Sequence, residues 1–243
     1  MKLRKEQDST QSYVNQRRLI LNSNASFHIQ EAYRSLQTNI RFSLPGNGCK
    51  VICLTSSMAS EGKSTTCLNL AISMAETGNR VLLIDADMRK PSLHRYLRTK
   101  KDPLMGLSAL LSGEMKVGDC LQNTEYGFDL IPGGPVPPNP VELISSEAMR
   151  ALLHEAAEHY DYIICDAPPV GVITDAAALS PLCDGVLYVI RQKYANKHQV
   201  HGAIQSLQTV NAKILGTVLN QYDISKDAVK GYGYSRGYGY GVE

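Results

Sequence analysis

The sequence has no uninterrupted apolar run of about 18 residues, the length that a membrane-spanning helix requires. Its first ten residues, MKLRKEQDST, also lack the apolar core of a secretory signal. The formal net charge is only +2, so there is no global basic field of the kind that draws a protein to nucleic acid. We therefore expect a cytoplasmic protein that does not bind nucleic acid on its own and that reaches a membrane only through a partner.

Paired cysteines are missing as well, because none of the six cysteines forms a C-x-x-C motif. An iron–sulfur scaffold would need such pairs, so that class of protein is disfavoured. Several of the cysteines lie inside apolar runs, which predicts buried, reduced thiols rather than disulfides. The six are Cys49, Cys53, Cys67, Cys120, Cys165 and Cys183.

The segment 51–66, VICLTSSMASEGKSTT, has the pattern of a phosphate-binding loop between a strand and a helix that begins near Lys63. Backbone N–H groups and the helix N-terminus would face the phosphates, Lys63 would add a charge, and the Ser64 hydroxyl could bind magnesium. The Walker A spacing G-x-x-x-x-G-K-[ST] is met with one departure, because Ser57 stands at the first glycine position. The residues expected to contact a nucleotide here are Ser57, Met58, Ala59, Ser60, Glu61, Gly62, Lys63, Ser64 and Thr65.

Two further apolar runs end in acids: residues 81–84 precede Asp85 and Asp87, and residues 162–165 precede Asp166. Continuous apolar runs are typical of buried parallel strands, whose carboxyl ends are where α/β sheets bind ligands. Asp166 completes the Walker B pattern and would hold magnesium opposite the Walker A serine. Of Asp85 and Asp87, one could bind magnesium and the other could accept a proton from an attacking hydroxyl.

Strands and helices alternate along the chain, which predicts a three-layer α/β fold. Its sheet would be mostly parallel and twisted, with helices on both faces, in one domain of the P-loop NTPase type. A helix is expected over residues 27–44, with Phe27, Ala32, Leu36 and Ile40 on its apolar face.

Three other segments carry local signals. A helix over 145–160 would be capped by Ser145 or Ser146. Asp175 opens another helix, where it is equally well a first-turn acid or a functional residue. The proline-rich segment 132–140 is expected to be an ordered loop over the site.

The ends of the sequence differ in composition from the middle. Residues 1–25 are polar and are expected to form a mobile arm, whereas 26–225 would form the nucleotide-binding domain. In residues 226–243 tyrosines alternate with glycines, which predicts a flexible tail with exposed hydroxyls. Such a tail can enter an active site, although a sticky tail or an aromatic association segment would have the same composition. Its tyrosines are Tyr232, Tyr234, Tyr238 and Tyr240.

The chain contains the strings SEGKST, LLIDADMRKP, PPNPVELISS and IICDAPPVGVITDA, followed by the tyrosine-rich tail. Together these resemble the bacterial tyrosine kinases, or BY-kinases, over about residues 28–243. More narrowly, they are similar to the cytoplasmic kinase of two-protein Gram-positive systems for capsular or extracellular polysaccharide. The resemblance implies an ATP- and magnesium-dependent kinase that phosphorylates the tail of a neighbouring subunit and then other proteins, and so regulates polysaccharide synthesis and export.

The resemblance also assigns roles to the acids and the Walker residues. Lys63 and Ser64 belong to Walker A, Asp85 and Asp87 to a second acidic motif termed A-prime, and Asp166 to Walker B. Asp85 is expected to be the general base for the phenol, although Asp87 could exchange roles with it. Magnesium would be held by Ser64, Asp87 and Asp166.

Glu31, Arg34 and Arg41 fit the family's E-x-x-R-x-x-x-x-x-x-R motif for assembly into rings, which are typically octameric in relatives. The family further implies a membrane-spanning adaptor that activates the kinase at the inner face of the membrane. It also implies a tyrosine phosphatase that resets the tail.

One rival shares the superfamily: a partner-regulated ATPase of the partitioning or septum-site type, without kinase activity. Those ATPases carry a lysine at the position of Met58, so this residue and the tyrosine tail disfavour the rival. By analogy with the superfamily, Asn220 at the end of the last strand is the candidate contact for adenine.

Overall fold

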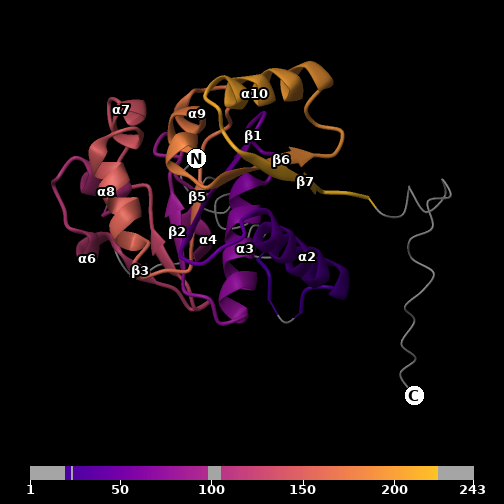
Figure 1. Ribbon diagram of the computed structural model, residues 1–243, viewed down its shortest axis with the longest axis horizontal. Coiled ribbons are helices and arrows are strands. Elements are labelled where there is room, and N and C mark those ends of the chain that lie inside the picture. Colours follow the sequence, from indigo (N-terminus) through magenta and orange to yellow (C-terminus); the bar gives the residue numbers. More distant parts are fainter. Residues whose placement is uncertain (1–19, 23, 98–104, 224–243) are drawn as a thin grey trace, which may run out of the picture.

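A single mixed sheet of seven strands forms the centre of the computed structural model, which describes residues 20–22, 24–97 and 105–223 (Figure 1). The strand order is β3-β4-β2-β5-β1-β6-β7, and every neighbouring pair is parallel except β3 with β4. The predicted mostly parallel sheet is thus confirmed. The strands are β1 (Lys50–Ser56), β2 (Val81–Asp85), β3 (Gln122–Asn123), β4 (Asp129–Ile131), β5 (Tyr162–Asp166), β6 (Gly185–Arg191) and β7 (Ile214–Asn220).

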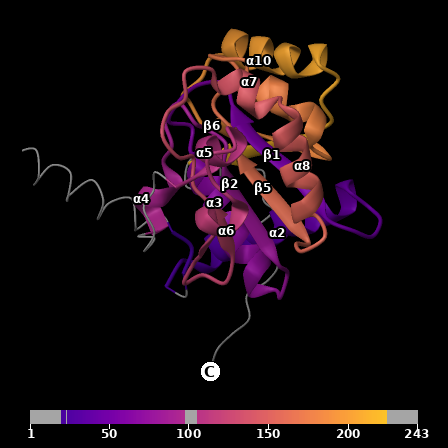
Figure 2. The same ribbon diagram turned by 90° about the vertical axis from the view of Figure 1, so that its left-hand side faces the viewer.

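Helices cover both faces of the sheet, as Figure 1 and Figure 2 show. Successive side chains of β1 serve two separate cores: Ile52 and Leu54 pack with one helical layer, Val51 and Cys53 with the other. The first layer holds α2 (Phe27–Ser43), α3 (Lys63–Glu76) and α4 (Leu93–Leu97). The second holds α5 (Leu107–Leu111), α6 (Val117–Cys120), α7 (Pro140–Ile144), α8 (Glu147–Ala156), α9 (Asp175–Leu179) and α10 (Lys197–Thr209).

Helix α3 is fixed at both ends by glycine. It begins directly after Gly62, and past its C-terminus Gly78 adopts φ +84°, where its N–H donates to Ala75 O and the next N–H donates to Met74 O. This left-handed turn closes the helix without steric cost, since glycine has no Cβ. Because α3 follows the loop that leaves the end of β1, its N-terminus lies at the carboxyl edge of the sheet.

The expected helix over residues 27–44 is present as α2, but its predicted apolar face is partly wrong. Phe27 is 68% exposed and Ala32 is also exposed, whereas Ile40 is buried and Leu36 is half-buried against α3. At 3.6 residues per turn Phe27 lies well away from the Ile40 side of the helix. Because α2 packs on a single neighbouring helix, only one narrow stripe is covered.

Three short elements carried no periodic signal and were not predicted. They are α4, α7 and the two-residue strand β3. The segment 132–140 is an ordered loop that ends in α7. Its start lies close to the β2 loop, which is the loop that follows β2 and leads to α4. A Cβ added to Gly133 would be 2.7 Å from Pro91 Cβ and 3.4 Å from Asp85 O.

The expectation of a mobile arm over residues 1–25 is wrong at its inner end. Ile20 and Leu21 are buried, and the Leu21 N–H donates to Asn69 Oδ1 on α3 at 2.8 Å. Residues 1–19 and the tail from 224 onward lie outside the described residues, so the tail tyrosines do too. Among the described helices, none combines the length and apolarity that crossing a membrane needs. All six cysteines are free thiols, and four of them are buried as predicted, whereas Cys49 and Cys183 are half-buried.

Our first prediction concerns the cap of α8, which the sequence left open between two serines. Ser146 Oγ accepts the Met149 N–H at 3.2 Å. Ser145, which directly follows α7, instead donates its Oγ hydrogen to Val141 O within that helix. Ser146→Ala is expected to lower the free energy of unfolding by about 1 kcal/mol, because it leaves a helix N–H without its partner. Ser145→Ala is the matched control and should change it by less than half as much in urea titrations. Equal losses would contradict this assignment.

Candidate active site

The phosphate loop connects β1 to α3 and turns through two left-handed residues, Ser60 (φ 65°) and Gly62 (φ 90°). Ser57, at the first Walker glycine position, is not one of them. Its buried hydroxyl instead shares a 2.6 Å hydrogen bond with the Tyr188 hydroxyl on β6. The departure from the Walker pattern therefore brings no backbone strain at Ser57, and the strain falls on Ser60.

Three contacts hold the loop closed. The Glu61 carboxylate is buried and accepts the N–H groups of Met58 at 2.7 Å and Arg191 at 3.3 Å. Asn220 Nδ2 donates to Glu61 O at 2.8 Å, which joins the end of β7 to the loop. A Cβ at Gly62 would collide with this amide, so glycine is required there by space as well as by φ.

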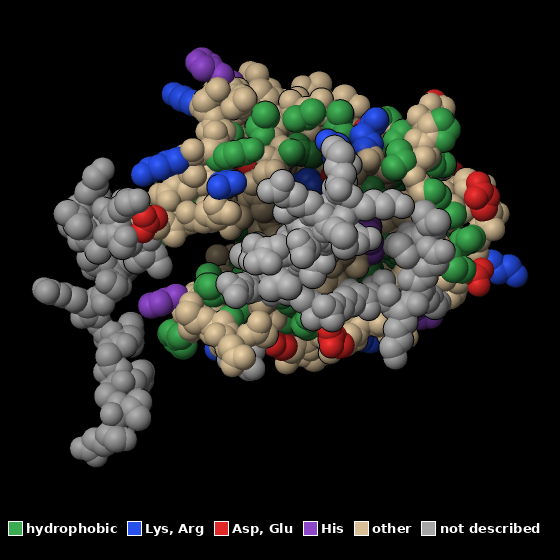
Figure 3. Space-filling view, turned by 180° about the vertical axis from the view of Figure 1, so that it is seen from behind, with side chains coloured by type: hydrophobic (Ala, Val, Ile, Leu, Met, Phe, Trp, Pro, Cys, Tyr) green, Lys and Arg blue, Asp and Glu red, His purple; other side chains and the backbone are tan. Residues whose placement is uncertain are grey.

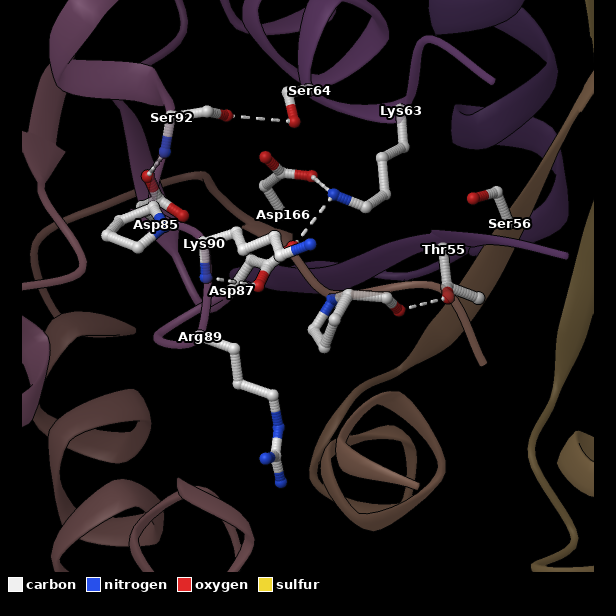
Figure 4. Close-up of polar contacts among 12 residues, drawn as sticks. Thr55, Ser56, Lys63, Ser64, Asp85, Asp87, Arg89, Lys90, Ser92 and Asp166 are labelled. Atoms are coloured by element: carbon white, nitrogen blue, oxygen red, sulfur yellow. Dashed lines mark hydrogen bonds and ion pairs between the residues drawn. The ribbon is translucent and has the colours of Figure 1, made fainter. Parts of the chain in front are cut away.

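Lys63 reaches across the loop to two acids, as Figure 4 shows. Its Nζ lies 3.2 Å from Asp87 Oδ2 and 3.7 Å from Asp166 Oδ1. Burial alone would lower the pKa of Lys63, but Asp166 and Asp87 outweigh it and raise that pKa above its usual value. The predicted Walker A lysine and two of the predicted acids are thus in direct contact.

Asp85 lies beside this group, since β2 and β5 are neighbours and Asp85 pairs in register with Asp166. Its Oδ2 accepts the N–H groups of Ser92 at 2.8 Å and Leu93 at 3.0 Å, at the start of α4. Burial, then the charge of Asp166, raise the pKa of Asp85 to about 7, against the two N–H groups that lower it. Its Oδ1 is buried and has no hydrogen-bond partner among the described residues.

Asp166 is also fully buried, and burial raises its pKa while Lys63 opposes the rise. The Ser64 hydroxyl and the Cys67 thiol lie near enough to lower this pKa, yet neither makes a hydrogen bond of normal geometry to the carboxylate. Within the described residues neither Asp166 oxygen thus accepts a hydrogen bond, although Oδ1 takes part in the ion pair with Lys63.

These oxygens fit a magnesium ion. Ser64 Oγ accepts a hydrogen bond from Ser92 Oγ at 3.2 Å and faces the acids (Figure 4). No three acidic, histidine or cysteine side chains in the described ranges form a complete metal cage. Magnesium suits such a site, because it takes one or two carboxylates and completes its shell with water and phosphate.

Sequence reasoning missed Ser92, which contacts both Ser64 and Asp85. Its only signal was its place between a proline and a helix. It also missed Thr55, whose hydroxyl donates to Pro168 O at 2.7 Å and accepts the Val170 N–H at 3.1 Å. Thr55 thus fastens the segment after Asp166 to the strand that leads into the phosphate loop.

A cavity of about 940 Å³ opens beside the phosphate loop, between the N-terminal segment, α2, the start of α3 and β7. Its walls include Thr65, Thr66, Asn69, Asn220 and Tyr222. The predicted adenine contact Asn220 therefore lines a cavity while it supports the loop.

The three predicted assembly residues lie outside the site on α2, with their side chains exposed. Glu31 and Arg34 form a 3.8 Å ion pair, and Arg41 lies 6.0 Å from the ring centre of Phe42. On the face drawn in Figure 3, lysine and arginine side chains are scattered among acidic and apolar ones.

Comparisons with known proteins identify relatives of this chain. A family model described as "AAA domain" matches residues 49–224. The chain is 38% identical over 203 residues to the tyrosine-protein kinase YwqD of Bacillus subtilis (strain 168), covering 83% of this chain and 85% of that protein. It is 36% identical over 212 residues to the tyrosine-protein kinase CpsD of Streptococcus pneumoniae, covering 86% and 92%.

Solved structures show the same likeness. The chimerical protein CapA2B2 superposes with a TM-score of 0.74 at 36% identity, over 78% of this chain and 83% of that chain. The kinase domain of the Escherichia coli tyrosine kinase ETK superposes with a TM-score of 0.74 at 31% identity, over 86% and 80%.

We predict that glycine at two serine positions of the phosphate loop changes the free energy of unfolding in opposite directions. Ser60→Gly should raise the free energy of unfolding by about 1 kcal/mol, because it relieves a left-handed backbone. Ser57→Gly should lower it by about 1–3 kcal/mol, because the buried Tyr188 hydroxyl loses its partner. Urea titration of both variants measures the two effects. A gain in stability on restoring the Walker glycine at Ser57 would overturn this account.

Proposed function

The chain belongs to the bacterial tyrosine-protein kinases, a family of P-loop ATPases, and from this premise we propose how its site transfers phosphate. It is a kinase associated with capsule or extracellular polysaccharide production, and we infer that it uses ATP with magnesium. One observation carries the proposal: Lys63 is held between Asp87 and Asp166, under the phosphate loop, beside buried carboxylate oxygens with no hydrogen-bond donor.

In this proposal the loop N–H groups and the α3 N-terminus cradle the phosphates of ATP. Lys63 turns from its acids to the β- and γ-phosphates, which offer more negative charge. The adenosine occupies the cavity beside Thr65 and Thr66, with Asn220 near the base. Ser64, Asp87 and Asp166 would hold magnesium, which neutralises charge on the phosphates and keeps them in line.

The transfer itself needs little covalent help from the protein. The phenol oxygen of a tyrosine bonds to the γ-phosphorus, the bond from that phosphorus to the bridging oxygen breaks, and ADP leaves. Asp85 accepts the phenol proton at its free Oδ1, since a carboxyl with a pKa of about 7 is partly ionised near neutral pH. Asp87 remains the alternative base. Without a base the phenol is unreactive, because its ordinary pKa is about 10.

We propose that the first acceptors are Tyr232, Tyr234, Tyr238 and Tyr240 of a neighbouring subunit. The exposed side chains of Glu31, Arg34 and Arg41 on α2 would form the contacts of a ring, with eight subunits as the expected size. Other proteins are then phosphorylated on tyrosine. A membrane-spanning adaptor would bring this cytoplasmic ring to the inner face of the membrane, and a tyrosine phosphatase would reset the tail.

Mass spectrometry of the purified chain with magnesium and ATP tests the proposal. Phosphate is expected on the C-terminal peptide of the wild type and should fall by about 100-fold or more in Lys63→Met, because transition-state charge loses a buried partner. Lys213→Met changes an exposed lysine just before β7; it is the control and should match the wild type. Hydrolysis of ATP without any phosphotyrosine would instead support the partner-regulated ATPase.

A further prediction concerns the size of the assembly. Each phosphate adds about −1.5 to −2 charges, so four would place a large negative charge on one short segment. We expect this repulsion to expel the tail and loosen the ring. Light scattering should therefore report a smaller particle for a fully phosphorylated preparation than for one treated with phosphatase. Equal sizes would refute the idea.

A further inference from the structure

Arg89 lies on the same loop as Asp87, but its side chain points away from Lys63 (Figure 4). It runs to Asp175 at the start of α9 and makes two hydrogen bonds, Nε to Oδ2 at 2.8 Å and Nη2 to Oδ1 at 3.0 Å. The Asp175 side chain is only 2% exposed, whereas that of Arg89 is 38% exposed. The buried Asp175 carboxylate thus forms a bidentate ion pair with Arg89. The planar guanidinium balances its charge and also fixes the relative orientation of the two side chains.

The pair joins two segments that carry the acids. The first is the loop after β2, which bears Asp87. The second is the segment after β5, which leaves Asp166 and reaches α9 nine residues later. The strands themselves are hydrogen-bonded up to Asp85 and Asp166. Beyond that point the Arg89–Asp175 pair joins the two segments directly, whereas Lys63 joins them by contacting both Asp87 and Asp166.

Each segment is also fixed on its other side. The β2 loop is tightened locally, because the Lys90 N–H donates to Asp87 Oδ1 at 3.0 Å. The β5 segment is fastened to the phosphate-loop strand by Thr55, and Gly171 packs against the Ser57 carbonyl with no room for a Cβ. The β5 segment is therefore the rigid part, and Arg89 ties the Asp87 loop to it.

We propose that Arg89 and Asp175 are positioning residues that set the separation between the carboxylates of Asp87 and Asp166. The inference rests on the proposed function, in which those two acids hold magnesium for the transfer. Arg89 is not among the residues proposed to hold nucleotide or metal, because its side chain bonds to Asp175. It acts through the loop, since a shift of about 1 Å at reacting groups can cost 100-fold in rate.

The chain offers a matched control in a second pair of the same chemistry. Arg80 and Asp161 stand just before β2 and β5, at the opposite ends of the same two strands. Arg80 Nη2 lies 2.9 Å from Asp161 Oδ1 and its Nε lies 3.4 Å from Oδ2. Their side chains are 62% and 40% exposed. If Arg89 served only to hold β2 against β5, loss of either pair would have similar effects.

The experiment compares Arg89→Lys with Arg80→Lys in the full chain, since lysine keeps the charge and removes the fork. Without nucleotide, amide hydrogen exchange of the segment 86–92 should be several-fold faster in Arg89→Lys and unchanged in Arg80→Lys. With ATP, kcat for tyrosine phosphorylation should fall about 10- to 100-fold in Arg89→Lys, while KM for ATP stays within about threefold. The magnesium concentration for half-maximal activity should rise. Arg80→Lys should match the wild type throughout.

The inference is overturned if Arg89→Lys keeps the wild-type kcat, or if kcat falls only in proportion to the folded fraction measured by circular dichroism. Should Arg89→Lys fold poorly, Asp175→Asn decides in the same way, because it keeps the side-chain shape and loses the charge. A wild type that makes no phosphotyrosine would defeat the proposed function. If the wild type makes phosphotyrosine and Arg89→Lys is equally active and equally protected from exchange, only the positioning role of Arg89 and Asp175 is contradicted.

Discussion

One buried cation facing three buried acids is the constraint on which this molecule depends. Lys63 contacts Asp87 and Asp166 directly, and Asp85 pairs in register with Asp166 one strand away. Removing an ion from water costs several kcal/mol, and a single lysine cannot offset that cost for three carboxylates. Burial, and then the charge of a neighbouring acid, raise the pKa values of Asp85 and Asp166. An excess of buried carboxylates over lysine favours the binding of a further cation.

The fold supplies the constraint through strand order. Because β5 lies between β2 and β1, two acidic strand ends and the phosphate loop meet at one edge of the sheet. Sequence sufficed for this much: each apolar run ending in Asp, and the run before the glycine–lysine–serine, predicted a buried parallel strand with polar groups at its carboxyl end. Such signals are local, and a parallel sheet combines them without further information.

What the sequence could not predict depends on contacts between distant residues. The strain at Ser60 and the hydroxyl pair of Ser57 with Tyr188 follow from how β6 lies against the loop. Phe27 looked like a core residue because helical spacing does not say how much of a helix a neighbour will cover. Asp175 stayed ambiguous between a first-turn acid and a functional residue, and its partner Arg89 is 86 positions away. Pairings of this kind carry no periodic signal.

The two contacts of Lys63 also explain why nucleotide and metal would act together under the proposed mechanism. Lys63 must leave Asp87 and Asp166 to reach the phosphates, which would leave two carboxylates without a counter-charge in a buried setting. Nucleotide alone therefore exposes the acids to mutual repulsion, and metal alone competes with a lysine already in place. Asp87 and Asp166 would hold magnesium as Lys63 turns to the phosphates, so these acids would not be left without a counter-charge. The exchange requires that the Asp87 loop stay in place while its cation changes, which is the task that the Arg89–Asp175 pair is built to perform.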